Sequence, residues 1–189
     1  VSVSAHGGSI DPTIIEHGSR DSKMVALTFD ACPTGRDDEY DERVIGVLIR
    51  EKVPATLFMS GRWVERNGVR AKYLADQPQS EIANHAFWHP HMLEKDDERI
   101  VRELKRTQAI IKKITGKRPK YFRPPFGEVD ERLARLASQA GLTMPSGAKT
   151  SLGSRRAGPL REASSKNSVN TIVPASSRPA ETTGRISTL

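Results

Sequence analysis

Four side chains in this sequence have the chemistry of a metal-assisted hydrolase. Asp30 ends an apolar run and precedes a turn containing Pro and Gly, where a carboxylate can take a proton from water. His85 and His89 lie four residues apart, and two neutral imidazoles on one side of a turn suit zinc or a similar divalent ion. Arg123 begins a rigid Arg-Pro-Pro-Phe-Gly turn, in which a guanidinium can hold a carboxylate through two N–H groups.

Each of these residues also has an ordinary structural explanation. A single aspartate at a strand end usually caps a loop or helix, and surface histidines four residues apart are common. His91 is a third imidazole, which we expect to face solvent. Cys32 follows Asp30 by two residues, and no sequence neighbour signals an activated thiol. We therefore expect Cys32 to be a small buried residue and not a nucleophile or ligand.

The elements that must position these residues alternate between β and α patterns from residue 24 to residue 144. This alternation predicts an α/β fold with a mainly parallel sheet. We expect strands at residues 25–29, 55–59, 81–84 and 121–123, and helices at about 39–52, from 96 or 97 to 116, and 130–141. The polar clusters all follow strands, so their side chains should converge on one edge of the sheet.

In combination and order, the segments Thr28-Phe29-Asp30, His85 to His89 and Arg123 to Gly127 resemble the motifs of the polysaccharide deacetylase family of carbohydrate esterases. The resemblance covers about residues 24–144. It implies a distorted (β/α) barrel that removes acetyl groups from chitooligosaccharides, peptidoglycan or other acetylated glycans.

The family's residue roles can be carried over to matching positions. Asp30 matches the catalytic base and Arg123 the residue that orients it, while His85 and His89 match the metal ligands. By the same resemblance the cofactor is a divalent metal, with zinc preferred and cobalt as an alternative. Three residues match or suit the substrate groove, namely Pro125, Phe126 and Trp88, the last as a stacking surface for a sugar, although packing is the commoner use of a tryptophan.

Three departures from the family pattern bear on activity. Ala31 stands where the family has a second aspartate that binds the metal, and Ala86 stands where Ser or Thr usually follows the first histidine. No histidine follows His91, so the family's C-terminal Leu-His pair, which supplies a general acid, has no counterpart. The resemblance therefore predicts a barrel that is incomplete at its C-terminal end.

Composition changes along the 189-residue chain. The net charge is +7, and from Pro145 onward seven Lys or Arg residues face two Glu, while Phe, Trp and Tyr all lie at or before Phe126. Such a segment cannot bury enough apolar surface to offset its ordering entropy. We predict an N-terminal extension at 1–23, a catalytic domain at 24–144 and a basic tail at 145–189. The tail is either disordered, translated out of frame, or a functional basic arm.

Three functions remain to be compared. The first is a metal-dependent deacetylase of acetylated glycans, and the second is a catalytically impaired carbohydrate-binding relative. A nucleic-acid-binding module ranks last, because the basic tail lacks aromatic residues for stacking. A single cysteine excludes an internal disulfide, no apolar run reaches the length of a membrane span, and no signal-peptide pattern opens the chain. A periplasmic or secreted location fits a glycan substrate better than a cytoplasmic one.

Overall fold

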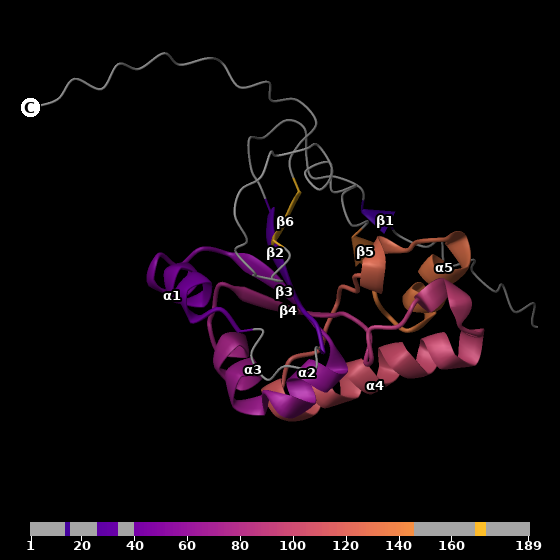
Figure 1. Ribbon diagram of the computed structural model, residues 1–189, viewed down its shortest axis with the longest axis horizontal. Helices are drawn as coiled ribbons and strands as arrows, with labels where there is room; N and C mark the ends of the chain where they lie inside the picture. The colour runs from indigo at the N-terminus through magenta and orange to yellow at the C-terminus, as the bar shows by residue number, and fades with distance from the viewer. Residues whose placement is uncertain (1–13, 16–25, 34–39, 146–168, 173–189) are drawn as a thin grey trace, which may run out of the picture.

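The computed structural model describes residues 14–15, 26–33, 40–145 and 169–172 (Figure 1). Its strands are β1 (Ile14–Ile15), β2 (Ala26–Ala31), β3 (Ala55–Met59), β4 (Ser80–Asn84), β5 (Met144–Pro145) and β6 (Val169–Ile172). Its α-helices are α1 (Glu42–Arg50), α2 (Gly61–Arg66), α3 (Gly68–Ala75), α4 (Asp97–Thr115) and α5 (Glu131–Gln139). Two short 3-10 helices are η1 (Met92–Glu94) and η2 (Pro125–Gly127).

A curved, mainly parallel array of strands runs through the molecule. β2, β3 and β4 pair in parallel, and β6 pairs antiparallel with the free side of β2. Single parallel bridges then join Asn84 to Phe122 and Tyr121 to Thr143, and β5 pairs in parallel with β1. The fold is therefore an α/β structure of the (β/α) barrel type, with β6 and β1 at the two ends of the described array.

The two faces of β2 serve different purposes. Leu27, Phe29 and Ala31 pack against a hydrophobic cluster formed with α2, α3 and the C-terminal half of α4. The alternate residues, Thr28 and Asp30, point to the opposite face, as the two-residue period of a strand requires. We call these the core face and the site face of β2.

A second hydrophobic cluster lies at the other end of the molecule. It joins the N-terminal half of α4 to α5 through Ile100, Leu104 and Leu133, and it includes Phe122 and Met144 from the strands. The 19-residue helix α4 thus contributes to both clusters, and it runs along one side of the molecule from one to the other (Figure 1). This long helix fixes the two halves of the fold to each other.

Most predicted elements are present, with different limits. The β3 strand has the predicted bounds, and α4 and α5 begin close to the predicted positions, directly after the capping residues Asp96 and Asp130. The first helix is shorter than predicted, because Asp41 caps it at one end and Lys52 adopts a positive φ of 52° after the other. The predicted strand at 121–123 forms only isolated bridges. Sequence patterns missed α2 and α3, which are short and separated by Asn67.

Part of the predicted tail is included in the fold. Residues Val169–Ile172 form β6, whereas residues 146–168 and 173–189 lie outside the described part, as does most of the N-terminal extension. The domain limits and the interpretations of the tail therefore remain predictions. None of the helices in the described ranges combines the length and apolarity needed to cross a membrane.

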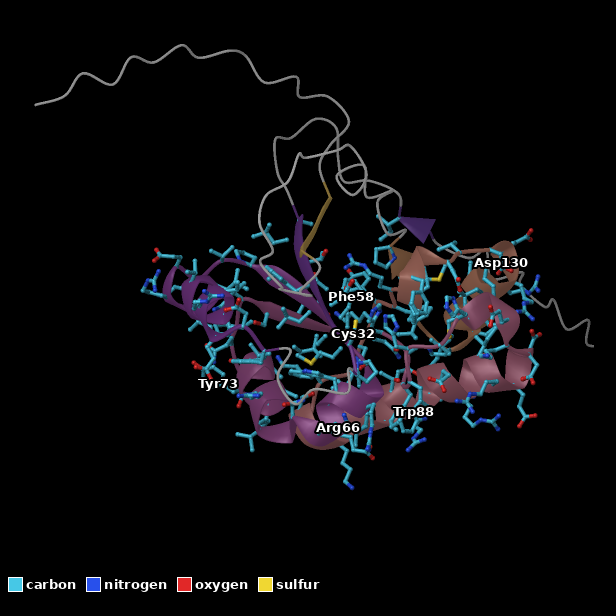
Figure 2. All side chains as sticks on the ribbon, in the orientation of Figure 1. Cys32, Phe58, Arg66, Tyr73, Trp88 and Asp130 are labelled. Atoms are coloured by element: carbon cyan, nitrogen blue, oxygen red, sulfur yellow. The ribbon has the colours of Figure 1, made fainter. Side chains whose placement is uncertain are left out.

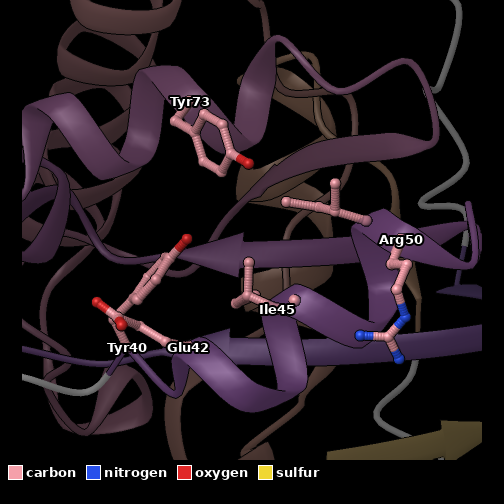
Figure 3. Close-up of a pocket in the computed structure, with 7 residues that line it drawn as sticks. Tyr40, Glu42, Ile45, Arg50 and Tyr73 are labelled. Atoms are coloured by element: carbon pink, nitrogen blue, oxygen red, sulfur yellow. The ribbon is translucent and has the colours of Figure 1, made fainter.

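A surface pocket of about 340 Å³ lies between α1 and α3 (Figure 3). Tyr40, Ile45 and Tyr73 line it, and the Arg70 guanidinium stacks 4.9 Å from the centre of the Tyr40 ring. None of its lining residues belongs to the polar clusters that follow the strands. The polar clusters that contain Asp30 and His85 lie elsewhere, at the ends of β2 and β4.

Candidate active site

Asp30 and Arg123 form a partly buried ion pair on the site face of β2. The Arg123 Nη1 atom donates to Asp30 Oδ1 at 2.6 Å, and Nη2 donates to the Thr28 hydroxyl at 2.8 Å. The guanidinium is only 3% exposed and stacks 4.1 Å from the centre of the Phe58 ring. Figure 2 shows Phe58 and Cys32 near the middle of the molecule. Arg123 is therefore fixed on three sides and holds the Asp30 carboxylate in one orientation.

The histidine loop, residues 84–89, follows β4 and is held from inside the protein. The Asn84 side chain accepts from the Ala86 N–H at 2.9 Å and donates to the Leu104 carbonyl oxygen at 3.0 Å. Glu103 Oε2 accepts from the backbone N–H groups of Phe87 and Trp88 at 2.9 and 2.8 Å. These bonds support a loop in which Ala86 and His89 adopt positive φ angles of 58° and 56°.

The N-terminus of α2 holds the same loop from another side. The N–H groups of Gly61 and Arg62 donate to the carbonyl oxygens of Ala86 and Phe87 at 2.9 and 3.0 Å. A Cβ atom at Gly61 would lie 2.2 Å from Cδ2 of Phe87, so only glycine fits there without movement. Three elements, β4, α2 and α4, thus determine the shape of the loop.

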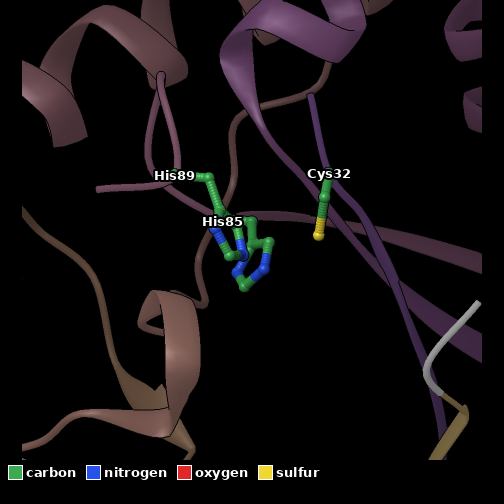
Figure 4. Close-up of side chains that lie close together, drawn as sticks. All are labelled: Cys32, His85 and His89. Carbon is green, nitrogen blue, oxygen red and sulfur yellow. The ribbon is translucent and has the colours of Figure 1, made fainter. Parts of the chain in front are cut away.

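The side chains of His85 and His89 lie close to the thiol of Cys32. One ring nitrogen from each of His85 and His89 and the Cys32 Sγ atom all lie within 4.8 Å of one another (Figure 4). The two rings are 4.9 Å apart between centroids and are inclined by 73°. His85 Nδ1 lies 2.8 Å from the Arg123 carbonyl oxygen, which can only accept, so Nδ1 carries the proton and Nε2 the lone pair.

Burial lowers the pKa of both imidazoles and so favours their neutral form. Burial, with a smaller contribution from the neighbouring His85 ring, lowers the pKa of His89 to about 4. Burial lowers the pKa of His85 too, against the opposing effect of the Asp30 carboxylate. Neutral imidazoles with an unprotonated ring nitrogen are the form that binds divalent metals. The donor set therefore fits the metal that the sequence resemblance implies.

Phe126 forms an aromatic wall beside the histidines. Its backbone is left-handed, with φ of 59°, and its side chain is 58% exposed. The Phe126 ring packs edge-on against His89 at 4.7 Å and stacks on His91 at 3.9 Å, while Pro125 beside it is buried. His91 Nδ1 is 2.8 Å from Glu128, and the imidazole is about half exposed, in keeping with the expectation that it faces solvent.

Trp88 has different neighbours from Phe126. The guanidinium groups of Arg62 and Arg106 lie 5.3 and 5.9 Å from the centre of its ring, which is 46% exposed (Figure 2). Those arginines belong to α2 and α4. The structure thus brings together Asp30, Arg123, His85, His89 and Phe126. The Trp88 ring lies beside the arginines of α2 and α4 instead.

Sequence reasoning missed Glu103 and misjudged Cys32. Glu103 is a carboxylate within the buried stripe of α4, between Ile100 and Thr107, and a charge in such a stripe is a signal of a buried partner. Cys32 is partly exposed and not buried, because it lies just past the end of β2. Its proximity to two histidines more than fifty residues away follows from the parallel pairing of β2, β3 and β4.

Comparisons with known proteins point to one family. Residues 17–145 match the family model described as polysaccharide deacetylase. A peptidoglycan-N-acetylglucosamine deacetylase of Bacillus cereus is 30% identical over 122 residues, which are 65% of this chain and 43% of that protein. The chain thus spans less than half the length of this curated relative.

Solved structures are also similar. A family 4 carbohydrate esterase from Bacillus anthracis has 30% identity and a TM-score of 0.63, with 71% of this chain and 63% of that chain covered. A CE4 family pseudoenzyme from the same organism has 28% identity and a TM-score of 0.62, with 71% and 46% covered. A mutant of that pseudoenzyme has restored enzymatic activity. The chain belongs to the polysaccharide deacetylase family.

Proposed function

We propose that this chain is a metal-dependent deacetylase of N-acetylglucosamine-containing or otherwise acetylated glycans. The observation that carries the proposal is the placement of an oriented carboxylate beside a pair of neutral imidazoles. Asp30 is fixed by Arg123 at 2.6 Å, and its charge acts on both His85 and His89. A general base next to a metal site is the arrangement that hydrolysis of an acetyl group requires.

The protein groups can be assigned to steps of the reaction. A divalent ion held by His85 and His89 would polarise the acetyl carbonyl as a Lewis acid. The Asp30 carboxylate takes a proton from a water molecule, whose oxygen attacks the carbonyl carbon. When the bond from carbon to nitrogen or oxygen breaks, acetate leaves and the sugar heteroatom takes a proton. Within the described residues, Asp30 is protonated by the first step and lies in the site, so it can return this proton to the sugar heteroatom.

The relatives and the aromatic wall support a glycan as substrate. The Bacillus cereus relative is a peptidoglycan-N-acetylglucosamine deacetylase. The exposed ring of Phe126, held against His89, offers an apolar surface to a sugar ring, and Pro125 fixes the turn that carries it. Because such glycans lie outside the cytoplasm, the proposal includes a periplasmic or secreted location.

A catalytically impaired carbohydrate-binding relative is the second candidate. Ala31 replaces the family's ligating aspartate, and a similar CE4 structure is a pseudoenzyme. This candidate predicts affinity for a glycan that EDTA does not change.

The test is acetate release from a short chitooligosaccharide by the 189-residue chain, with zinc or cobalt added and with EDTA as control. We expect metal-dependent release that falls by about 10²–10⁴-fold in Asp30→Asn. Asp76→Asn is the matched control, since Asp76 is an exposed carboxylate paired with Lys72 on α3, and its activity should be unchanged. Metal-independent binding without release, from folded protein, would support the second candidate instead.

A further inference from the structure

Cys32 continues the site face of β2. It follows Asp30 by two residues, so the alternation that turns Asp30 toward Arg123 also turns the next even-numbered side chain in that direction. Ala31, between them, packs its methyl group against the hydrophobic cluster on the core face. The thiol therefore projects beside the two imidazole rings (Figure 4).

The three donor atoms are close enough to share one ion after small side-chain movements. Bond lengths of about 2.3 Å to sulfur and about 2.0–2.1 Å to nitrogen give tetrahedral ligand-to-ligand distances of about 3.3–3.6 Å. The Cys32 Sγ atom and one ring nitrogen from each of His85 and His89 all lie within 4.8 Å of one another. Closing the set requires movements of roughly 1 Å, within the reach of side-chain torsions alone.

The hydrogen bond of His85 is of the kind that metal-binding histidines make. A ligating imidazole almost always donates its second ring N–H to a carboxylate or a backbone carbonyl, which fixes the orientation of the lone pair. His85 is 2% exposed and bonds the Arg123 carbonyl oxygen through Nδ1 at 2.8 Å. Its Nε2 lone pair is thereby fixed without any contribution from Cys32, so this bond and the thiol's position are independent observations.

We propose that Cys32 is the third protein ligand of the metal site, together with His85 and His89. This proposal rests on the proposed function only in assuming a divalent ion at the two histidines. On binding, the thiol releases its proton to solvent and the sulfur donates a lone pair to the ion, with no change in oxidation state. Three protein ligands then leave a fourth position open, as in catalytic zinc sites.

A thiolate ligand also determines which ions the site prefers. Sulfur ligands favour zinc over hard ions such as magnesium and calcium, which bind oxygen. The thiolate would supply the negative charge that Ala31 lacks. In this chain, Ala31 packs in the hydrophobic cluster, and the thiolate of Cys32 would carry the charge at the metal.

The test reads the ligand atoms directly. The full chain is loaded with one equivalent of zinc, and X-ray absorption at the zinc edge is recorded for wild type and Cys32→Ser. We expect a zinc–sulfur distance of about 2.3 Å in wild type and nitrogen or oxygen ligands alone in the variant. Zinc affinity should fall on the order of 100-fold, at or above the effect of removing a supporting residue.

One further variant and a check of folding make the outcomes distinct. Cys32→Ala checks that any loss is due to the missing sulfur and not to serine, and circular dichroism confirms that each variant is folded. Zinc bound without sulfur, or with equal affinity in Cys32→Ser, would overturn the inference, while metal-dependent acetate release in the same sample would leave the proposed function intact. A folded wild type that binds no zinc would overturn both.

Discussion

The histidine loop at residues 84–89 and the end of β2 contribute the two halves of the site, but they are held in different ways. The loop is fixed by buried polar groups from β4, α2 and α4, including Asn84 and Glu103. The end of β2 depends on strand pairing and on the ion pair from Asp30 to Arg123. The loop is therefore held mainly by buried side chains and hydrogen bonds from three elements, and the end of β2 mainly by the neighbouring strand and one ion pair.

Removal of Glu103 should have the largest effect on the histidine loop, because this side chain is one of its buried supports. In Glu103→Ala the backbone N–H groups of Phe87 and Trp88 and the Arg99 guanidinium lose their shared acceptor. We expect the free energy of unfolding, measured by urea denaturation, to fall by about 3–5 kcal/mol.

Glu98→Ala is the matched control for that change. Glu98 lies on the same helix, is 85% exposed and pairs with Arg102, so its removal should cost below about 1 kcal/mol. Glu103→Gln keeps one acceptor oxygen and should fall between the two. Equal losses in Glu103→Ala and Glu98→Ala would mean that the loop does not depend on its buried carboxylate.

Gly61→Ala should strain the loop by a smaller amount. The new Cβ would lie 2.2 Å from the Phe87 ring, which must move together with the histidine loop. We expect a loss of about 1–3 kcal/mol in urea denaturation. In Gly46→Ala, within α1, nothing lies within 4 Å of the new Cβ, so the same substitution should stabilise by about 0.5–1 kcal/mol. Changes of the same sign in both variants would contradict this account.

The stability of the fold should depend on pH because of the partly buried His89. The unfolded chain protonates His89 near the ordinary value of 6.5, but the folded chain does so only at about 4. Between these values the unfolded state binds more protons, so the stability of the metal-free chain is highest above 6.5 and falls as the pH drops toward 4.

His89→Gln should show a shallower decline than wild type over that window. Urea denaturation at several pH values after dialysis against EDTA measures it. His85, whose pKa burial also lowers, would account for part of the slope that remains. An unchanged slope in His89→Gln would show that this imidazole is not kept neutral by the fold.

Local patterns in the sequence predicted the elements that carry strong signals of their own. The bounds of β3 and the first residues of α4 and α5 follow from nearby residues, because Asp96 and Asp130 cap the two helices. The helices α2 and α3 are six and eight residues long, too short for a clear period, and were missed. The segment 121–123 has a strand-like sequence but pairs only through single bridges.

The sequence predicted several residues of the candidate site, but not the contacts that Glu103 and Cys32 make with them. The spacing of His85 and His89 and the turn after Arg123 are visible along the chain, and the structure brings these residues together with Asp30. The bonds of Glu103 and the approach of Cys32 depend on how helices and strands pack, and no sequence spacing encodes them. A single carboxylate within the apolar stripe of a helix, such as Glu103, indicates a buried polar partner.

The strict alternation of β2 has a consequence for how its sequence can change. A shift of pairing by one residue would turn Ala31 into the site and press Asp30 and Cys32 into the hydrophobic cluster. Such a register slip would bury a charge and a thiol and remove the proposed catalytic base from the site in one step. A chain with shifted pairing would therefore lose stability and the arrangement of the site together. Variants of β2 that keep their folding stability should also keep the site correctly assembled.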